Sequence, residues 1–433
     1  MSRSASASRR RLLAFPWPVG AGHVGRCMAL ARVLGPDYEI VFAADPTGNM
    51  VAAGGFHTVG AAGPRPRSPF PAADYLAITG PGDAFASMWY YRASRIRAQV
   101  EADRALIRRV RPDGVVTHMH PTSAIAARCE GVPIVSVADA DFFVTGPAGW
   151  MPWLGDGGAR VSPFPPSLPA FNEVLADYGQ KPIEECSDLL IGDLALIASV
   201  PEVELPDVRY RDRSDIHYVG PLVWDPDLDG DLARRLRAFT VPGRIQVYAS
   251  VGGGAVSTQE IAAAAQDAAA AHGWSLVLSG GLGVTPEPAG GGAQVLRQRF
   301  GGITAASAWA AVVVCHGGHS TVLAALQAGK PVVVVPAMSE NEGNGRHLVS
   351  ANGVGLALVT SSIGEGNRVR LTPRRTPAGD ARFVDGPGLA DAVSEVMDDP
   401  SYRLRAGELS LRLRDAARAA PARTRALLAG IGL

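Results

Sequence analysis

Two histidines stand where the sequence passes from an apolar run through glycines into a helical pattern. His23 follows Gly20-Ala-Gly22 in the first half of the chain, and His316 begins His-Gly-Gly-His-Ser-Thr in the second half. Unpaired backbone N–H groups and the helix dipole favour an anion at a helix N-terminus. The same dipole disfavours an imidazolium, so His23 should keep a neutral nitrogen that accepts a proton near pH 7. The pattern predicts a diphosphate site after His316 and a candidate base at His23.

The residues after His316 suit phosphate binding. Gly317 and Gly318 allow a ligand to approach the backbone. The hydroxyls of Ser320 and Thr321 either cap the helix or donate to phosphate oxygens. An ordinary capped helix after a tight turn is the structural alternative.

A carboxylate and an amide, Glu340 and Asn341, follow the next apolar run. In a parallel α/β sheet this position lies at the carboxyl end of a strand, where ligands bind. The carboxylate accepts hydrogen bonds, and the amide both donates and accepts them, so the pair suits the hydroxyls of a sugar. A turn with helix-capping acids is the alternative interpretation.

The elements that must position these residues alternate between strand and helix. The first half contains strand 12–15, helix 23–34, strand 39–44, helix 84–110, strand 114–117, helix 122–129 and strand 134–137 by its apolar periodicity. The second half contains strand 246–250, helix 258–271, strand 275–278, strand 311–315, helix 321–328 and strand 332–335. This alternation predicts two doubly wound parallel sheets, followed by one or two Arg-rich helices at 402–433.

The composition excludes several classes of protein. The 433 residues include 41 Lys+Arg and 41 Asp+Glu, so the net charge is zero and no nucleic-acid partner is expected. No apolar run approaches the ~20 residues of a membrane-spanning helix. The four cysteines lack C-x-x-C spacing, which indicates reduced thiols in the cytoplasm rather than disulfides or structural zinc. Residues 1–11 are expected to form a disordered leader.

Residues 315–345 resemble the donor-binding signature of family 1, UDP-glucuronosyltransferase-like, glycosyltransferases: H-x-G-x-[NSG]-[ST]-x-x-x-A-x-x-x-G-x-P, then an acid-amide pair and an Asn. Five further stretches are similar to bacterial natural-product members, in the expected order: 15–31, 112–137, 198–206, 218–222 and 247–253. The resemblance implies the α/β GT-B fold, with two Rossmann-like doubly wound domains around a cleft and a C-terminal helix that crosses back. The implied segments are an acceptor domain at 12–222, a linker at 223–240, a nucleotide-sugar domain at 241–410 and the crossing helix at 411–433.

The resemblance also implies a donor site on three loops. Its residues are Ser250, Gly252, Gly253, His316, Gly317, Gly318, Ser320, Thr321, Glu340 and Asn341. The first two loops would hold the diphosphate, and Glu340-Asn341 would replace the family's Asp-Gln pair on the donor sugar. Many members carry a Glu for the ribose hydroxyls where this chain has Ala324, which suits dTDP better than UDP.

In similar enzymes the general base lies at the position of His23. An acceptor hydroxyl would lose its proton to His23 as it attacks the anomeric carbon, with inversion and without a metal or other cofactor. Many relatives orient this histidine with an Asp, where this chain has His118. His118, Asp139 and Asp141 are each candidates for the orienting partner.

Two histidines of one predicted strand could together bind a metal ion. His118 and His120 would face one side of a strand with a period of two. No acidic or cysteine partner stands at a supporting spacing, so a metal site is not expected.

The acceptor is expected to be a small, apolar molecule such as a natural-product aglycone. Aromatic residues of the first half are candidates to line its cleft, although core packing is the alternative. They are Trp89, Tyr90, Phe142, Phe143, Trp150 and Trp153. A homodimer is also compatible with the sequence.

Other functions fit parts of the sequence. The stretch Gly20-Ala-Gly22-His-Val-Gly25, with Asp45 at the end of the next predicted strand, matches the dinucleotide fingerprint of NAD(P)- or flavin-dependent oxidoreductases. That interpretation leaves residues 315–345 unexplained. Residues 22–31 also resemble GT-B nucleotide-sugar hydrolases, in which water replaces the acceptor. A non-catalytic homologue is a third alternative, against which the retention of both histidines argues.

Overall fold

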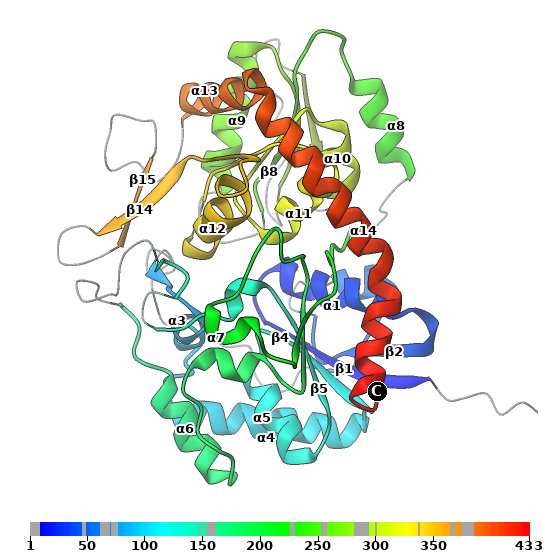
Figure 1. Ribbon diagram of the computed structural model, residues 1–433, viewed down its shortest axis with the longest axis vertical. Helices are drawn as coiled ribbons and strands as arrows, with labels where there is room; N and C mark the ends of the chain where they lie inside the picture. The colour runs from blue at the N-terminus through cyan, green and yellow to red at the C-terminus, as the bar shows by residue number, and fades with distance from the viewer. Residues whose placement is uncertain are drawn as a thin grey trace, which may run out of the picture.

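The computed structural model contains a parallel β-sheet in each half of the chain, with helices on both faces of each sheet (Figure 1). The described residues are 9–45, 49–60, 70, 77–146, 149–152, 162–225, 230–252, 258–280, 294–298, 301–336, 338–363, 369–373 and 385–433. The prediction of two doubly wound sheets is confirmed.

The first sheet has seven strands in the order β3-β2-β1-β4-β5-β6-β7. They are β1 (Arg10–Pro16), β2 (Tyr38–Phe42), β3 (His57–Thr58), β4 (Gly114–His118), β5 (Ile134–Ala138), β6 (Leu194–Ile197) and β7 (Ile216–Tyr218). β4 and β5 are buried along their whole length, as expected of strands covered on both faces. β3, β6 and β7 have two, four and three residues and are too short to show a periodic pattern in the sequence.

The second sheet has six strands in the order β10-β9-β8-β11-β12-β13. They are β8 (Gln246–Ser250), β9 (Ser275–Ser279), β10 (Gln294–Gln298), β11 (Val312–Cys315), β12 (Val332–Val334) and β13 (Gly355–Ala357). A separate antiparallel pair joins β14 (Val359–Ile363) to β15 (Val369–Pro373). The strand order reverses between β1 and β4 in the first sheet and between β8 and β11 in the second, which makes a topological switch point in each.

Most of the predicted helices are confirmed within a few residues. The first half contains α1 (Ala21–Leu34), α2 (Met50–Ala53), α3 (Pro81–Ala86), α4 (Ala93–Val110), α5 (Pro121–Glu130), α6 (Leu168–Asp177) and α7 (Val208–Arg211). The second half contains α8 (Gly230–Phe239), α9 (Thr258–His272), α10 (Ile303–Trp309), α11 (His319–Gln327), α12 (Ser339–Asn344), α13 (Gly386–Asp398) and α14 (Pro400–Gly430). α8 occupies most of the stretch expected to be a linker.

The predicted single helix at 84–110 is wrong, because α3 and α4 share that stretch. Between them the backbone turns at Trp89, whose φ of 71° lies in the left-handed region. The Arg92 guanidinium lies 4.7 Å from the centroid of the Trp89 ring. Trp89 also stacks on Tyr91, with 6.0 Å between the ring centroids. These local contacts accompany a turn that the helical spacing of apolar residues does not reveal.

One helix, α14, occupies the stretch where one or two were predicted, and it continues through Pro421. Ala406 and Leu413 pack into a core cluster of the second half, and Leu428 packs into a cluster beneath the first sheet. Figure 1 shows α14, in red, running from the second sheet to the first. The prediction that the C-terminal helix crosses back is confirmed.

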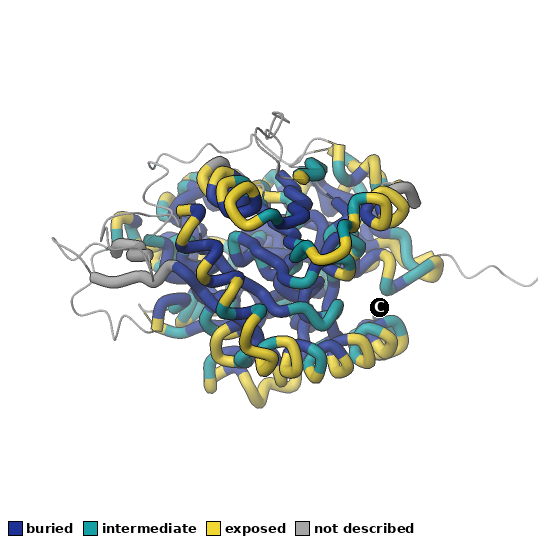
Figure 2. The backbone as a smooth tube through the Cα atoms, turned by 90° about the horizontal axis from the view of Figure 1, so that it is seen from above, coloured by how far each residue is buried: buried dark blue, intermediate teal, exposed yellow. Residues whose placement is uncertain are grey.

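The burial pattern follows the layers. Figure 2 shows buried backbone, in dark blue, at the centre of the molecule and exposed backbone, in yellow, on the outer helices. Within the described ranges, no helix combines the length and the apolar character that a membrane span requires.

Candidate active site

The switch points of the two sheets open onto one cavity of about 240 Å³. In the first sheet Pro16 pairs with His118, at the carboxyl ends of β1 and β4. In the second sheet Cys315 pairs with Ser250, at the carboxyl ends of β11 and β8. Ligands of open α/β sheets bind in this crevice. The helices that follow β1 and β11, α1 and α11, lie between the two sheets in Figure 1.

The cavity brings together most of the predicted site residues from both halves. Those that line it are His23, His118, Ser250, Gly252, His316, Gly318, Ser320, Thr321, Glu340 and Asn341. Gly317 is not among the lining residues, and its carbonyl accepts a hydrogen bond from Nδ2 of Asn344 at 2.8 Å. Gly253 lies outside the described residues.

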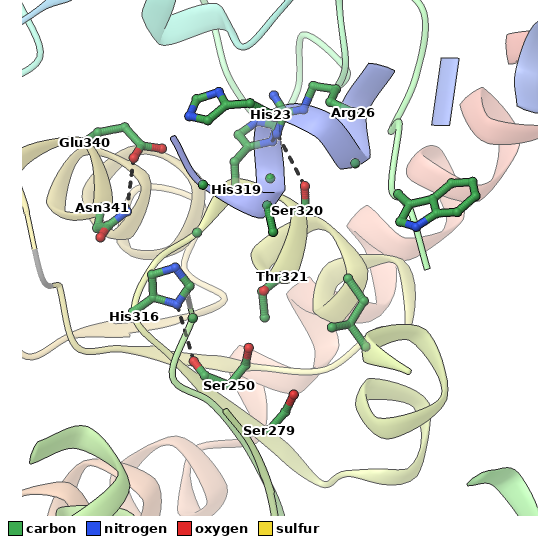
Figure 3. Close-up of a pocket in the computed structure, with 18 of the residues that line it drawn as sticks. His23, Arg26, Ser250, Ser279, His316, His319, Ser320, Thr321, Glu340 and Asn341 are labelled. Atoms are coloured by element: carbon green, nitrogen blue, oxygen red, sulfur yellow. Dashed lines mark hydrogen bonds between the residues drawn. The ribbon is translucent and has the colours of Figure 1, made fainter. Parts of the chain in front are cut away.

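His23 lies in the first turn of α1 and lines the cavity (Figure 3). Burial, and then the charge of Arg26, lower the pKa of His23 to about 3. The imidazole is therefore neutral near pH 7, with burial rather than the helix dipole as the main cause. Nδ1 of His23 is buried and has no hydrogen-bond partner among the described residues.

His118 ends β4, and its ring centroid lies 4.9 Å from that of His23. Burial, followed by the electrostatic effects of the neighbouring His23 and Arg26, holds the pKa of His118 well below its usual value. Nδ1 of His118 lies 2.7 Å from the carbonyl oxygen of Val137. Because a carbonyl only accepts, Nδ1 carries the proton of this neutral ring and Nε2 carries a lone pair. The ring of His118 thus packs against His23 in a fixed tautomer.

The predicted shared face of His118 and His120 is wrong. β4 ends at His118, and Met119 has a φ of 57°, in the left-handed region. His120 consequently lies at the N-cap of α5, where its ring packs on Phe15 with 5.5 Å between centroids. In the part of the chain that the structure describes, no group of three or more His, Cys, Asp or Glu side chains is placed to hold a metal ion.

The two aspartates considered as partners of His23 have other surroundings. Asp139 forms a buried ion pair with Arg26. Asp141 lines a separate cavity of about 430 Å³, and burial is the first cause that raises its pKa well above the usual value. Among the hydrogen bonds of the described residues, none joins either aspartate to His23.

Two glycines set the position of the His316 ring. A Cβ atom at Gly252, whose φ is +74°, would lie 2.6 Å from Cε1 of this ring, and a Cβ atom at Gly318 would lie 2.6 Å from Nε2. A side chain at either position would displace the imidazole. On the remaining side, the carbonyl oxygen of Ser250 lies 3.4 Å from Nδ1 (Figure 3). Burial lowers the pKa of His316.

The N-terminus of α11 opens toward the cavity. Gly318 is the N-cap residue and no side chain caps the helix, so capping by Ser320 or Thr321 is not observed. Both hydroxyl-bearing residues line the cavity instead. Backbone N–H groups of a first helical turn lack intrahelical acceptors, so this end of the helix suits phosphate oxygens.

Glu340 and Asn341 lie in the first turn of α12. Nδ2 of Asn341 donates to Oε2 of Glu340 at 3.1 Å (Figure 3). Nδ2 of Asn344 donates to Oε1 of Glu340 at 2.9 Å. Burial raises the pKa of Glu340, against the opposing effect of Asn344. The two amides therefore hold this carboxyl group at the cavity wall. Asn344 follows Glu340 by four residues, the spacing of neighbours on a helix.

A buried polar network that the motifs do not predict joins the two halves. Nη2 of Arg26 lies 3.1 Å from Nδ1 of His319, and Nε2 of His319 lies 2.6 Å from Oε1 of Glu204. Arg26, His319, Glu204 and Asp139 are each at most 6% exposed. One signal was available in the sequence, since Arg26 follows His23 by three residues and therefore shares its helix face.

Four of the aromatic residues considered for the acceptor cleft are core residues, at most 5% exposed: Tyr90, Phe142, Phe143 and Trp150. Trp150 also lines the second cavity. Trp89 is half-buried in the turn between α3 and α4, and Trp153 lies outside the described residues. The core-packing alternative therefore holds for most of this set.

Asp45, the carboxylate of the dinucleotide fingerprint, forms a hydrogen bond away from the cavity. Oδ2 of Asp45 accepts the backbone N–H of Val51 at 2.9 Å, and Asp45 is not among the residues that line the cavity. In dinucleotide-binding proteins the equivalent acid binds a ribose. The geometry does not support the oxidoreductase alternative.

Comparisons with known proteins agree with this geometry. Residues 297–362, which contain the stretch 315–345, match the model of the glycosyltransferase family 28 C-terminal domain. A PGL/p-HBAD biosynthesis glycosyltransferase of Mycobacterium tuberculosis is 26% identical over 93% of this chain and 89% of its own. A PGL/p-HBAD biosynthesis rhamnosyltransferase of Mycobacterium bovis is 26% identical over 94% of this chain and 84% of its own.

A solved structure shares the fold. The spinosyn rhamnosyltransferase SpnG complexed with thymidine diphosphate has a TM-score of 0.61 and 17% sequence identity, and the match covers 97% of this chain and 99% of that chain. The predicted GT-B fold is confirmed by this likeness and by the order of the strands. The family 28 domain match, the mycobacterial relatives and the shared fold together identify the chain as a glycosyltransferase of the GT-B fold, similar to bacterial natural-product glycosyltransferases.

Proposed function

We propose that this glycosyltransferase moves a sugar from a nucleoside diphosphate sugar to a small apolar acceptor, with inversion at the anomeric carbon and without a metal cofactor. One observation carries the proposal: His23 on α1 and the N-terminus of α11 line the same cavity from opposite halves of the chain. An in-line displacement needs a base on one side of the reacting carbon and a site for the departing anion on the other.

His23 would act as the general base. The acceptor hydroxyl gives its proton to a ring nitrogen of His23, which burial keeps neutral, while the acceptor oxygen bonds to the anomeric carbon. The bond between that carbon and the phosphate oxygen breaks, and its electron pair leaves with the nucleoside diphosphate. His118 would position the ring of His23 by packing against it.

The donor would lie along the second half of the cavity. The residues proposed to bind its diphosphate are Ser250, Gly252, His316, Gly318, Ser320 and Thr321, with Gly317 and Gly253 completing the two loops. Glu340 and Asn341 would bind hydroxyls of the donor sugar, because their carboxyl and amide groups are held at the cavity wall.

Two observations favour dTDP over UDP as the nucleotide. Ala324 lies on α11 at 2% exposure, so this position offers no carboxylate to a ribose 2′-hydroxyl. The solved neighbour SpnG is complexed with thymidine diphosphate. The names of the relatives, PGL/p-HBAD biosynthesis and spinosyn, favour a natural-product aglycone or a glycolipid precursor as the acceptor.

Calorimetric titration with dTDP, UDP and GDP tests the donor site. We expect dTDP to bind most tightly and His316→Ala to weaken that binding. His23→Ala should keep nucleotide affinity while transfer to the acceptor is lost, because its ring serves the acceptor. His57→Ala changes an exposed histidine on β3 and is the control for loss of an imidazole. Unchanged dTDP affinity in His316→Ala would overturn the phosphate assignment.

The nucleotide-sugar hydrolase alternative predicts a different product. Release of free sugar without an acceptor, at a rate comparable to full turnover, would favour it over glycosyl transfer. We expect such release to be slow beside transfer, because water does not fill the acceptor cleft as an aglycone does.

A further inference from the structure

Arg26 carries the one full positive charge among the described residues that line the cavity. Asp139 and Glu340 line the same cavity with carboxyl groups, and the burial of His23 and His316 lowers the pKa of each. A nucleoside diphosphate that leaves a sugar carries at least two negative charges near pH 7. Its departure into a buried site therefore needs a cationic group as well as neutral N–H donors.

The contacts of Arg26 point this charge toward α11. Asp139 pairs with Nη1, which fixes one edge of the guanidinium. Nη2 lies 3.1 Å from Nδ1 of His319 and 3.5 Å from Oγ of Ser320, the first residues of α11 (Figure 3). Nε is buried and has no hydrogen-bond partner within the described ranges. A guanidinium offers five N–H donors, so donors remain for a phosphate beside the helix N-terminus.

The position of Arg26 on α1 decides which phosphate it faces. Arg26 follows His23 by three residues, so both side chains extend from one face of the helix. The β-phosphate is bonded to the anomeric carbon that the acceptor attacks, and the acceptor must touch His23. The β-phosphate consequently lies nearer to α1 than the α-phosphate does.

We propose that Arg26 is a leaving-group residue: its guanidinium, supplied by the helix that carries His23, binds the β-phosphate of the donor at the N-terminus of α11. This inference rests on the proposed glycosyl transfer and deepens it. One helix of the first half would then supply the base for the acceptor and the counter-charge for the departing diphosphate. The second half alone would hold the nucleoside and the α-phosphate.

The test compares dTDP with dTMP, which lacks the β-phosphate, by calorimetry on the full chain. Arg26→Gln alone would leave the buried carboxylate of Asp139 unpaired and endanger folding. The informative variant is therefore Arg26→Gln/Asp139→Asn, and Asp139→Asn alone, which keeps the guanidinium, is its matched control. Circular dichroism and the melting temperature confirm that each variant is folded.

The reference for the double variant is Asp139→Asn rather than the wild type, because these two variants differ only at Arg26. The double variant should bind dTDP about tenfold more weakly than Asp139→Asn, or worse, while its dTMP affinity changes by less than about twofold. Equal dTDP affinity in the double variant and its control would refute the proposal. An equal loss for dTDP and dTMP would refute it too, because that result marks a structural role alone.

Arg26→Lys gives a second comparison should the double variant not fold. It keeps the charge beside Asp139 but loses the planar fork, so the dTDP affinity should fall and the dTMP affinity should stay. An unchanged preference for dTDP over dTMP would count against the proposal. Failure of the proposed function would give a different result. In that case the wild type would bind neither dTDP nor UDP, or His316→Ala would bind dTDP as tightly as the wild type does.

Discussion

Nε2 of His319 lies 2.6 Å from Oε1 of Glu204, and this contact joins the first turn of α11 to the first half of the molecule. Arg26 only donates, so Nδ1 of His319, 3.1 Å from its Nη2, must accept. The proton of the ring is therefore on Nε2, which donates to an ionised Glu204. The pKa directions agree with a neutral His319 and an ionised Glu204. Burial lowers the pKa of His319. Burial acts to raise the pKa of Glu204, but His319 and its hydrogen bond lower it overall.

Glu204→Gln should destabilise the protein by about 1.5–3 kcal/mol, because it removes the charge from a buried charge-assisted hydrogen bond. Oε2 of Glu204 also accepts the backbone N–H of Ala140 at 3.0 Å, and an amide nitrogen there would face another donor. Urea denaturation measures the free energy of unfolding. Glu202→Gln is the control, since Glu202 pairs with Arg412 at the surface, where such pairs contribute about 0–1 kcal/mol. Equal effects of the two substitutions would contradict this account.

The sequence predicts the large elements and fails where short-range contacts decide. Long helices and buried strands, such as α1 and β8, follow from periodicity and apolar runs over many residues. The break between α3 and α4 depends on the left-handed backbone of Trp89. The same kind of local event, a φ of 57° at Met119, separates His120 from the cavity. Neither residue is one that favours this conformation, so composition gives no signal.

The pH dependence of kcat/KM should report the burial of His23. Burial and Arg26 lower its pKa to about 3, so the base stays neutral in the free enzyme far below the usual histidine range. We expect kcat/KM to stay level from about pH 8 down to about pH 5, over the range in which circular dichroism shows a folded protein. An acid limb with a midpoint near 6.5 would mean that His23 is solvated in the free enzyme, contrary to the structure.

Asp103 should make the protein less stable as the pH rises. It is fully buried between Gln99, whose Nε2 donates at 3.0 Å, and Thr122, whose hydroxyl donates at 2.7 Å. Burial raises the pKa of Asp103 to about 7 in spite of these bonds. The folded state then holds a proton that the unfolded state has released, so stability present at about pH 4 is lost as the pH rises through about 7.

Asp103→Asn removes that proton equilibrium. The free energy of unfolding of Asp103→Asn, minus that of the wild type, should increase between about pH 5 and 7. The increase should be at most about 1.4 kcal/mol per pH unit. Urea denaturation at several pH values measures it. Asp415→Asn is the control, because Asp415 pairs with Arg418 at the surface, where such pairs contribute about 0–1 kcal/mol. A constant difference for Asp103→Asn would show that its carboxyl is ionised in the folded protein.

Part of the candidate site can be predicted from the sequence, and part of it cannot. The loop that contains His316 is predicted because its ligand groups are contiguous in the chain. The network of Arg26, Glu204 and His319 joins residues up to 293 positions apart, so no local pattern contains it. Its members meet because the switch points of two separate sheets face one another.

Gly252→Ala should weaken nucleotide binding as well as stability. The position has a φ of +74°, and the added methyl group would lie 2.6 Å from Cε1 of His316, which must then move. Gly243→Ala is a matched control, because Gly243 has a φ of +80° with nothing within 4 Å of a built Cβ atom. Both substitutions should destabilise the fold by about 1–2 kcal/mol through left-handed backbone strain.

Only Gly252→Ala should also reduce the affinity for dTDP, by about tenfold if one charge-assisted contact to phosphate is lost. Calorimetric titration of both variants, each checked for folding by its denaturation curve, separates the two effects. The comparison isolates the effect of displacing the His316 ring. Backbone strain is common to Gly252→Ala and Gly243→Ala, whereas only the alanine at position 252 would contact His316. Equal nucleotide affinity in the two variants would mean that displacing His316 does not matter to the donor, and the phosphate site would have to be sought elsewhere along the cavity.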